Sequence, residues 1–209
     1  MNRLTRSERA AQSRQRVLVA AGKMFRKKGF HKAGLDEIAD QAGFSKGVIY
    51  SQFGSKDELF LALMEERMEQ RVGQMLELVR SVPQHLALRE VWERGRKVRQ
   101  SDVHWSLAVL EFRIQAARDP ELNRRYQALH TRTLEGLAGV FDELAARTNL
   151  QLKYRPIDFA RFIAALDTGG LLEELAEGPG SAFDLSRDAV CLLLTQSQPQ
   201  APDLEEEAS

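Results

Sequence analysis

Apolar residues recur at intervals of three and four along most of the chain, which is the period of one face of an α-helix. The pattern predicts a helix that ends at Lys27-Lys28-Gly29. Short helices are then expected over 35–41 and 46–53, and longer helices over about 55–82, 84–99, 102–118, 120–148, 157–177 and 182–195. We find no convincing strand pair and no internal repeat. The expected fold class is therefore all-α.

Residues at the predicted helix boundaries have suitable capping chemistry. Ser55 precedes Glu58 by three residues, which is a signature of a helix start. Asp119-Pro120 is a second start signal, because Asp accepts hydrogen bonds from free N–H groups and Pro fits the first turn. Ser45 is expected to cap the helix over 46–53, and Gly43 to stop the helix before it. These signals support the boundaries that the periodicity predicts.

The chain is neutral overall, but its charge is unevenly distributed. Of its 209 residues, 43% are hydrophobic and 29% are charged, which is an ordinary globular balance. Residues 1–60 hold 12 Lys and Arg against 6 Asp and Glu, a net charge of +6, so the remainder of the neutral chain carries −6. Such asymmetry suggests that the N-terminal part faces an anionic partner. The first 14 residues, with four arginines, look like a basic arm that leads into a helix.

The two short helices, joined by a turn that contains Gly43, match helix-turn-helix geometry. In the helix over 46–53, Val48, Ile49 and Phe53 are expected to point into the core. The outward positions would then be suited to the major groove and the DNA backbone. The expected DNA-contacting residues are Ser45, Lys46, Gly47, Tyr50, Ser51, Gln52 and Lys56.

Residues 12–62 resemble the DNA-binding signature of the TetR family of bacterial regulators. The matching segments are Phe25–Phe30, Leu35–Ala39, Ala42–Tyr50 and Phe53–Leu59. The resemblance implies phosphate contacts for Lys46, Tyr50 and Lys56. Ser51 and Gln52 are expected at base edges, and Lys46 and Gly47 suit either role. The alternatives are that Tyr50 only packs on the surface, and that Ser51 and Gln52 are exposed and neutral.

The sequence departs from the family pattern at Gly34. The family usually has Ser or Thr there, which caps the second helix and contacts phosphate. Glycine is an acceptable cap, at a cost of only a few tenths of a kcal/mol relative to Ser. It has no hydroxyl, however, so we do not assign that phosphate contact to this chain.

The resemblance divides the chain into a helix-turn-helix domain with a basic arm (1–54), a helical regulatory and dimerisation domain (55–196) and a tail expected to be disordered (197–209). It implies a dimer interface formed by the last two long helices. The Gly169-Gly170 pair inside a helix supports close approach of two helices, while a bend beside a pocket is the alternative. The interface candidates are Phe162, Leu166, Gly169, Gly170, Val190 and Leu194.

The middle helices provide apolar and polar side chains suited to a ligand pocket. Glu111 and Arg113 are the unusual members, because they lie in the apolar run from Leu107 to Ile114. The alternative for Trp105 and Phe112 is that they only pack in the core. The alternative for Glu111 is that it forms an ion pair at the surface or between helices. The pocket candidates are Trp92, His104, Trp105, Glu111, Phe112, Arg113 and Phe141, with His130 noted beside them.

Several other classes find no support in the sequence. The four histidines show no metal-ligand spacing with each other or with Cys191, which is expected to be a buried apolar residue. No nucleotide-binding or hydrolase motif occurs. No apolar run approaches the length of a membrane span, and no signal-peptide pattern is present. We therefore expect a cytoplasmic protein that is not an enzyme and holds no metal or cofactor.

Together these patterns predict a homodimeric transcriptional regulator, in the first instance a repressor. It would bind a near-palindromic double-stranded operator and be released by an unknown small molecule. Three alternatives remain. They are an activator of the same fold, a repressor without a ligand, and a ligand-binding helical module whose DNA binding is weak or lost.

Overall fold

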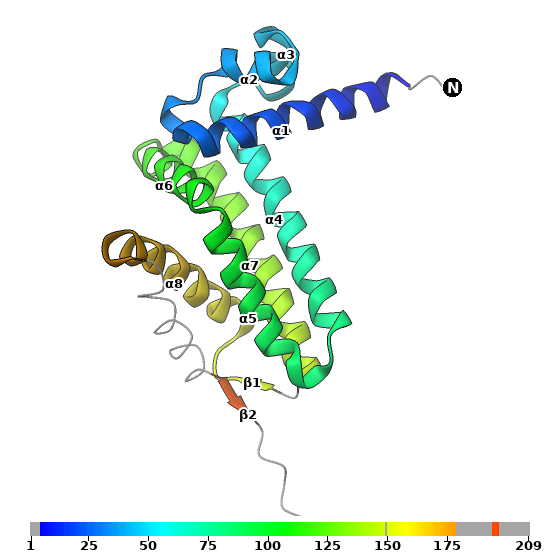
Figure 1. The fold of residues 1–209 in the computed structure, drawn as a ribbon, viewed down its shortest axis with the longest axis vertical. Helices are drawn as coiled ribbons and strands as arrows, with labels where there is room; N and C mark the ends of the chain where they lie inside the picture. Colours follow the sequence, from blue (N-terminus) through cyan, green and yellow to red (C-terminus); the bar gives the residue numbers. More distant parts are fainter. Residues whose placement is uncertain (1–4, 149, 179–193, 197–209) are drawn as a thin grey trace, which may run out of the picture.

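The computed structural model describes residues 5–148, 150–178 and 194–196, and these residues form the helical architecture that the periodicity predicts (Figure 1). α1, α2 and α3 lie at one end, α4 leads away from them, and α5 to α8 form the remainder. The helices are α1 (Arg6–Lys32), α2 (Leu35–Ala42), α3 (Lys46–Phe53), α4 (Lys56–Ser81), α5 (Gln84–Ser101), α6 (Val103–Arg118), α7 (Pro120–Thr148) and α8 (Pro156–Glu177). We call residues 5–54 the head and residues 55–178 the body.

The first helix begins earlier than expected. α1 already starts at Arg6, so most of the predicted basic arm is helical. The reason is a capping box, in which the Thr5 hydroxyl accepts a hydrogen bond from the Glu8 N–H and the Glu8 carboxylate accepts one from the Thr5 N–H. The Thr5-x-x-Glu8 spacing was visible in the sequence. At the other end, Gly29 breaks the helix with φ of 78°, as predicted, and one more turn runs to Lys32.

The turn between α2 and α3 confirms the predicted helix stop at Gly43 and corrects the predicted side-chain cap at Ser45. Gly43 adopts the left-handed conformation (φ 72°, ψ 38°) and ends α2, as expected. Ser45 does occupy the N-cap position of α3, but its hydroxyl makes no capping hydrogen bond. Instead the Ser45 carbonyl accepts from the Val48 N–H at 3.0 Å. The Ser45 hydroxyl is left on the surface.

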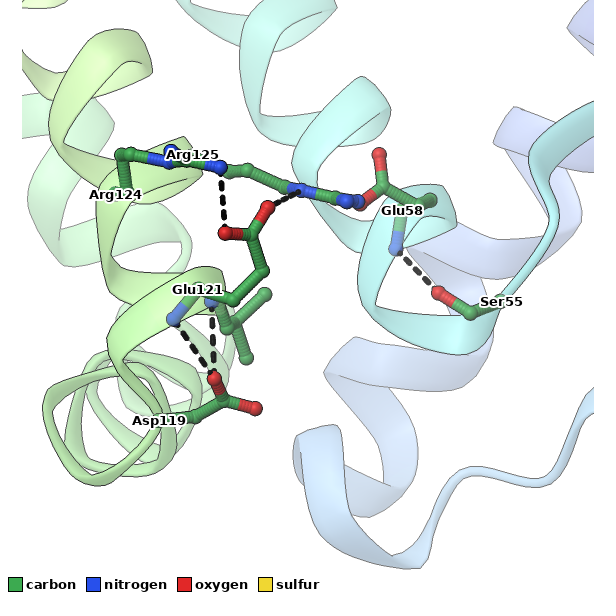
Figure 2. A network of polar contacts seen from close by, with 7 residues as sticks. Ser55, Glu58, Asp119, Glu121, Arg124 and Arg125 are labelled. Atoms are coloured by element: carbon green, nitrogen blue, oxygen red, sulfur yellow. Dashed lines mark hydrogen bonds and ion pairs between the residues drawn. The ribbon is translucent and has the colours of Figure 1, made fainter.

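The starts of α4 and α7 confirm the predicted caps and lie side by side (Figure 2). The Ser55 hydroxyl accepts from the Glu58 N–H at 3.1 Å, and the Asp119 carboxylate accepts from the Leu122 N–H at 3.1 Å. Arg125 bridges the two helices through ion pairs with Glu58 and with Glu121. These pairs are exposed, so they fix the register of α4 against α7 more than they add stability.

Two short strands were not predicted. β1 (Leu150–Leu152) pairs with β2 (Leu194–Gln196) in an antiparallel ladder, with Leu150 opposite Gln196. The helix predicted over 182–195 is therefore wrong at its end, where Leu194 and Thr195 belong to β2. Three residues are too few for an alternating pattern to be recognised in a sequence. The rest of that predicted helix, with Val190 and Cys191, and the tail over 197–209 lie outside the described residues.

A cluster of aromatic rings joins the head to the body. Phe25 and Phe30 of α1, Phe60 of α4 and Phe112 of α6 are fully buried. The ring centroid of Phe60 lies 4.9 Å from those of both Phe30 and Phe112. Because side chains from both regions share one core, packing does not stop at the predicted domain boundary at Gly54. That boundary stays a prediction.

Candidate DNA interface and ligand cavity

One face of α3 is held against the head, and the other is open to solvent. Ile49 and Phe53 are buried as predicted, while Val48 is only half-buried. The opposite face exposes Lys46, Gly47, Tyr50 and Ser51, and the Tyr50 side chain is 48% exposed. A phenol, a cation and a hydroxyl on one short helix can contact phosphates and base edges together.

Three side chains of α1 hold α2 and α3 in place. The Arg14 guanidinium lies 4.4 Å from the centre of the Phe53 ring, and Arg16 donates to the Ala42 carbonyl at 2.8 Å. The amide of Gln52 donates to the Ser13 hydroxyl at 2.9 Å. The prediction that Gln52 points outward is therefore wrong, because this amide is half-buried against α1. Sequence reasoning also placed Arg14 in the arm, where it had no packing role.

Lys46 is partly neutralised by a neighbour in the head. Its ammonium group forms an ion pair with Asp36 of α2 at 2.9 Å, and both side chains are exposed. The hydrogen bond to Asp36 raises the pKa of Lys46, so the charge is secure at any physiological pH. A phosphate group at this position would compete with the Asp36 carboxylate for the same cation.

Lys56 is occupied inside the protein. Its ammonium donates to the carbonyls of Phe30 at 2.9 Å and His31 at 3.1 Å, and it lies 4.7 Å from the centre of the Phe30 ring. Burial is the main cause that lowers the pKa of Lys56. This lysine therefore caps the carbonyl end of α1. A phosphate contact by the same ammonium, which stays a prediction, would require it to leave these carbonyls.

The body encloses a cavity of about 530 Å³ between α4, α5, α6, α7, α8 and β1. This volume falls within the range of small-molecule sites. Four of the seven predicted pocket residues line it, namely Trp92, Trp105, Arg113 and Phe141. The others, His104, Glu111 and Phe112, do not. Sequence reasoning missed the polar walls that other helices contribute, which include Arg67, Asp102 and Thr168.

The three misplaced residues lie on other faces of α6. His104 is exposed, and Phe112 is fully buried in the aromatic cluster, as its alternative stated. Glu111 meets the head, where its carboxylate accepts from the His31 N–H at 3.1 Å. No ion pair of Glu111 is found among the described residues, and its carboxylate instead binds a backbone N–H of α1. A seven-residue spacing puts His104 and Glu111 on one face, but that face is turned away from the cavity.

α8 presents apolar side chains on two sides. Phe159 and Leu171 are buried and line the cavity, whereas Leu172 and Leu175 are each 51% exposed. Of the predicted interface residues, Phe162, Leu166 and Gly170 are half-buried and Gly169 is exposed with open space beside it. Val190 lies outside the described residues, and of Leu194 only the backbone is described.

Neither a membrane-spanning helix nor a metal site is found among the described residues. None of the described helices is long and apolar enough to cross a membrane. Within the same residues, no group of three His, Cys, Asp or Glu side chains is arranged to hold a metal ion.

Comparison with known proteins assigns the head. Residues 17–63 match the sequence profile of bacterial regulatory proteins of the tetR family. This stretch covers most of α1, all of α2 and α3, and the first turns of α4. The head is therefore a TetR-family DNA-binding domain. With such a domain the chain is a transcriptional regulator and not an enzyme, and its fold class is the predicted one.

Two named relatives regulate transcription in opposite directions. The chain is 44% identical over 80 residues to the HTH-type transcriptional activator FasR of Mycolicibacterium smegmatis, and this stretch covers 38% of this chain and 35% of FasR. It is 28% identical over 181 residues to the HTH-type transcriptional repressor AcnR of Corynebacterium efficiens, which covers 81% of this chain and 90% of AcnR. The chain thus matches about a third of the activator but most of the repressor.

Solved structures share the fold of most of the chain. The transcriptional regulator FadR of Bacillus subtilis, in complex with stearoyl-CoA, superimposes with a TM-score of 0.65 at 18% identity and covers 88% of this chain and 99% of its own. A Saccharomonospora viridis protein in complex with choline, described as a transcriptional regulator, gives 0.61 at 16% identity over 87% and 94%. At such identities the likeness shows the fold alone.

Proposed function

We propose that this TetR-family regulator binds a near-palindromic operator as a homodimer, with α3 of each protomer in the major groove, and that a small molecule in the body cavity releases it. The exposed face of α3 carries the proposal. Lys46, Tyr50 and Ser51 project from a helix short enough to enter the groove, and the net charge of +6 on residues 1–60 supports the approach to DNA.

The packing of the head sharpens the roles of individual residues. Lys46 and Tyr50 are assigned to phosphates, and Ser45 and Gly47 can approach base edges or the backbone. The Ser51 hydroxyl donates to the Val48 carbonyl at 2.9 Å and can still accept a hydrogen bond from a base edge. Gln52 is a poorer candidate for base contact, because its amide is held by Ser13. We assign Lys56 to positioning of the turn after α1, because its ammonium already has carbonyl partners.

The outer face of α8 supports the homodimer. Exposed large apolar side chains on one helix face are costly in water and favour a protein contact. Leu172 and Leu175 form such a pair next to Gly169, where a partner helix could approach closely. To read adjacent half-sites of a two-fold symmetric operator, the two α3 helices would have to lie about 34–36 Å apart, which is one turn of DNA.

α6 is the element through which a ligand would act. Its Trp105 and Arg113 line the cavity, while its Phe112 and Glu111 contact the head. A ligand that prefers one position of α6 would therefore also select a position of α3. Only such a preference between two states shifts DNA binding.

The first experiment is selection of operators from a random duplex pool at about 150 mM salt, where non-specific phosphate binding is weak. We expect a two-fold symmetric motif that is lost when Tyr50→Ala or Lys46→Ala is introduced. Lys97→Ala is the matched control, because it removes the same charge from an exposed position on α5. A motif without symmetry would contradict the dimer, and no motif after refolding to strip bound ligand would favour the module with lost DNA binding.

The sign of control needs a separate test, because the two named relatives are an activator and a repressor. A reporter gene placed behind the selected motif decides it. We expect lower expression in the presence of the regulator. Higher expression would make the chain an activator of the same fold.

A further inference from the structure

The charged side chains of the cavity wall are unevenly paired. Arg67, Arg71 and Arg113 face Asp102 and Asp167 among otherwise mostly apolar walls. Because a buried charge is costly without a partner, the pairing of each group indicates what a ligand must supply.

Arg67 and Asp102 satisfy each other. The Arg67 guanidinium forms an ion pair with the Asp102 carboxylate, and Arg26 approaches the same carboxylate at 3.8 Å. Arg67 also lies 4.3 Å from the centre of the Trp105 ring. One carboxylate and one aromatic face of the cavity are therefore already occupied by a cation of the protein.

Arg113 is the contrasting case. It is half-buried, and its Nη1 donates to the Thr168 hydroxyl at 3.2 Å, while the guanidinium lies 5.9 Å from the centre of the Tyr126 ring. The Thr168 hydroxyl donates to the Ala164 carbonyl, so it is a neutral acceptor for Arg113. No carboxylate lies within ion-pair distance of Arg113 in the described part of the chain. Its other N–H groups make no hydrogen bond there.

The neighbours of Arg113 do not supply the missing negative charge. Tyr126 is neutral, and burial raises its pKa further. His130 stacks on Tyr126 at 5.7 Å between ring centroids, and burial, followed by the charges of Arg113 and Arg161, lowers its pKa. Arg161 is exposed and bonded to Asp158. The corner between α6, α7 and α8 is thus a positive pole at the edge of an apolar cavity.

We infer that the cavity binds an amphipathic carboxylate, with its acid group on the free edge of Arg113 and its apolar part along Val109, Leu137, Phe141 and Ile163. A guanidinium matches a carboxylate with two parallel hydrogen bonds, and the match is strong where water is excluded. The inference names the chemical class of the ligand in the proposed function. It rests on that function only for the claim that the ligand releases the protein from DNA.

A cationic ligand is disfavoured by the same geometry. Recognition of a quaternary ammonium needs open aromatic faces or free carboxylates. Asp102 and the Trp105 face are taken by Arg67, Asp167 also has a partner, and Arg113 would repel a second cation. The anion is therefore the choice that the wall favours.

Three probes with one tail and different head groups test the charge. Dodecanoate, dodecanol and dodecyltrimethylammonium are titrated into the full chain by calorimetry, each below its aggregation threshold. We expect dodecanoate to bind about tenfold tighter than dodecanol, and the cation to bind weakest. Equal affinities, tighter binding of the cation, or no binding of dodecanoate would each overturn the inference.

Variants of Arg113 locate the acid group. Arg113→Gln is expected to remove the preference of dodecanoate over dodecanol while leaving dodecanol binding unchanged, and Arg113→Lys to retain part of the preference. Arg118→Gln, exposed on the same helix and outside the cavity wall, is the control that keeps it. An equal loss for both probes in Arg113→Gln would mean that Arg113 only supports packing, and the inference would fail.

The readout without DNA separates this inference from the proposed function. If dodecanoate binds selectively through Arg113 but leaves operator binding unchanged, the cavity assignment stands and ligand release is wrong. If operators are bound and no probe prefers the carboxylate form, the DNA function stands and the inference is wrong.

Discussion

The head and the body differ in how closely their helices pack. In the head, α1 and two helices of eight residues close on a core of fully buried residues such as Val17, Ile38 and Ile49. In the body, helices of 16 residues or more leave a cavity of about 530 Å³ between them. Helices as short as α2 and α3 pack stably only with particular residues at particular spacings, so their sequence is easily recognised. Long helices stay stable around a gap, which leaves the lining residues free to vary.

Charge follows the same division. Residues 1–60 carry a net charge of +6 within a neutral chain. The excess lies mainly on exposed positions of the head, where it is available to an anionic partner, while three cations of residues 1–60 bind backbone carbonyls, namely Arg16, Arg26 and Lys56. In the body the informative charge is a single guanidinium, that of Arg113. The head therefore uses charge for long-range attraction, and the body uses it for local recognition.

The largest contrast is expected between truncating a ring at the junction of head and body and truncating a ring at the cavity wall. Phe60→Ala should lower the free energy of unfolding by about 3–5 kcal/mol, because Phe60 is fully buried among Phe25, Phe30, Trp105 and Phe112. Phe141→Ala at the cavity wall should cost less than half as much, because it enlarges a space that already exists. Chemical denaturation measures both. Equal losses would contradict the difference in packing.

A pair of glycine substitutions comes next. Gly29→Ala should cost about 1–3 kcal/mol, because Gly29 has φ of 78° and ψ of 172°, a region that alanine avoids. An added Cβ would also lie 2.6 Å from the Glu111 carboxylate, which holds the His31 N–H. Gly139→Ala, in open space within α7, should instead raise stability by about 0.5–1 kcal/mol. Thermal unfolding of both variants provides the test, and a stable Gly29→Ala protein would mean that the junction relaxes.

Two lysines of the head region should separate stability from DNA binding. Lys56→Met is expected to cost about 1–3 kcal/mol, because it leaves the carbonyls of Phe30 and His31 without their charged donor. Lys46→Met should change stability by less than about 0.5 kcal/mol, because its ion pair with Asp36 is exposed. Lys46→Met should nevertheless weaken operator binding and reduce its salt dependence. A Lys56→Met protein that is stable but fails to bind DNA would show that Lys56 contacts DNA and does not support the fold.

The smallest effect concerns pH. Burial and the nearby arginines lower the pKa of His130, so folding favours its neutral form. The unfolded chain therefore takes up this proton first, and the associated stability is lost as the pH falls below the ordinary histidine value. His130→Gln and His130→Phe should both lose less stability than the parent between about pH 7.5 and 5.5. Denaturation at the two pH values checks this, and an unchanged slope in both variants would show that His130 is not involved.

Sequence patterns identified most of the fold and the exposed face of α3. Helix periods and caps such as Ser55 and Asp119 act over a few residues, so they can be recognised without the tertiary structure. The same patterns could not show that Lys56 turns back to the end of α1 or that Gln52 binds Ser13. They also could not show that β1 meets β2, because each of these contacts joins residues at least 25 positions apart.

The sequence by itself determined that this protein is helical, that its N-terminal end is a helix-turn-helix and that Lys46, Tyr50 and Ser51 lie outward. Only the tertiary structure decided which side chains of α6 reach the cavity. One helix carries Arg113 to the ligand space, Phe112 to the core and Glu111 to the head. Periodicity places these residues on different faces, but the neighbours that each face meets depend on how α1, α4, α7 and α8 pack around it.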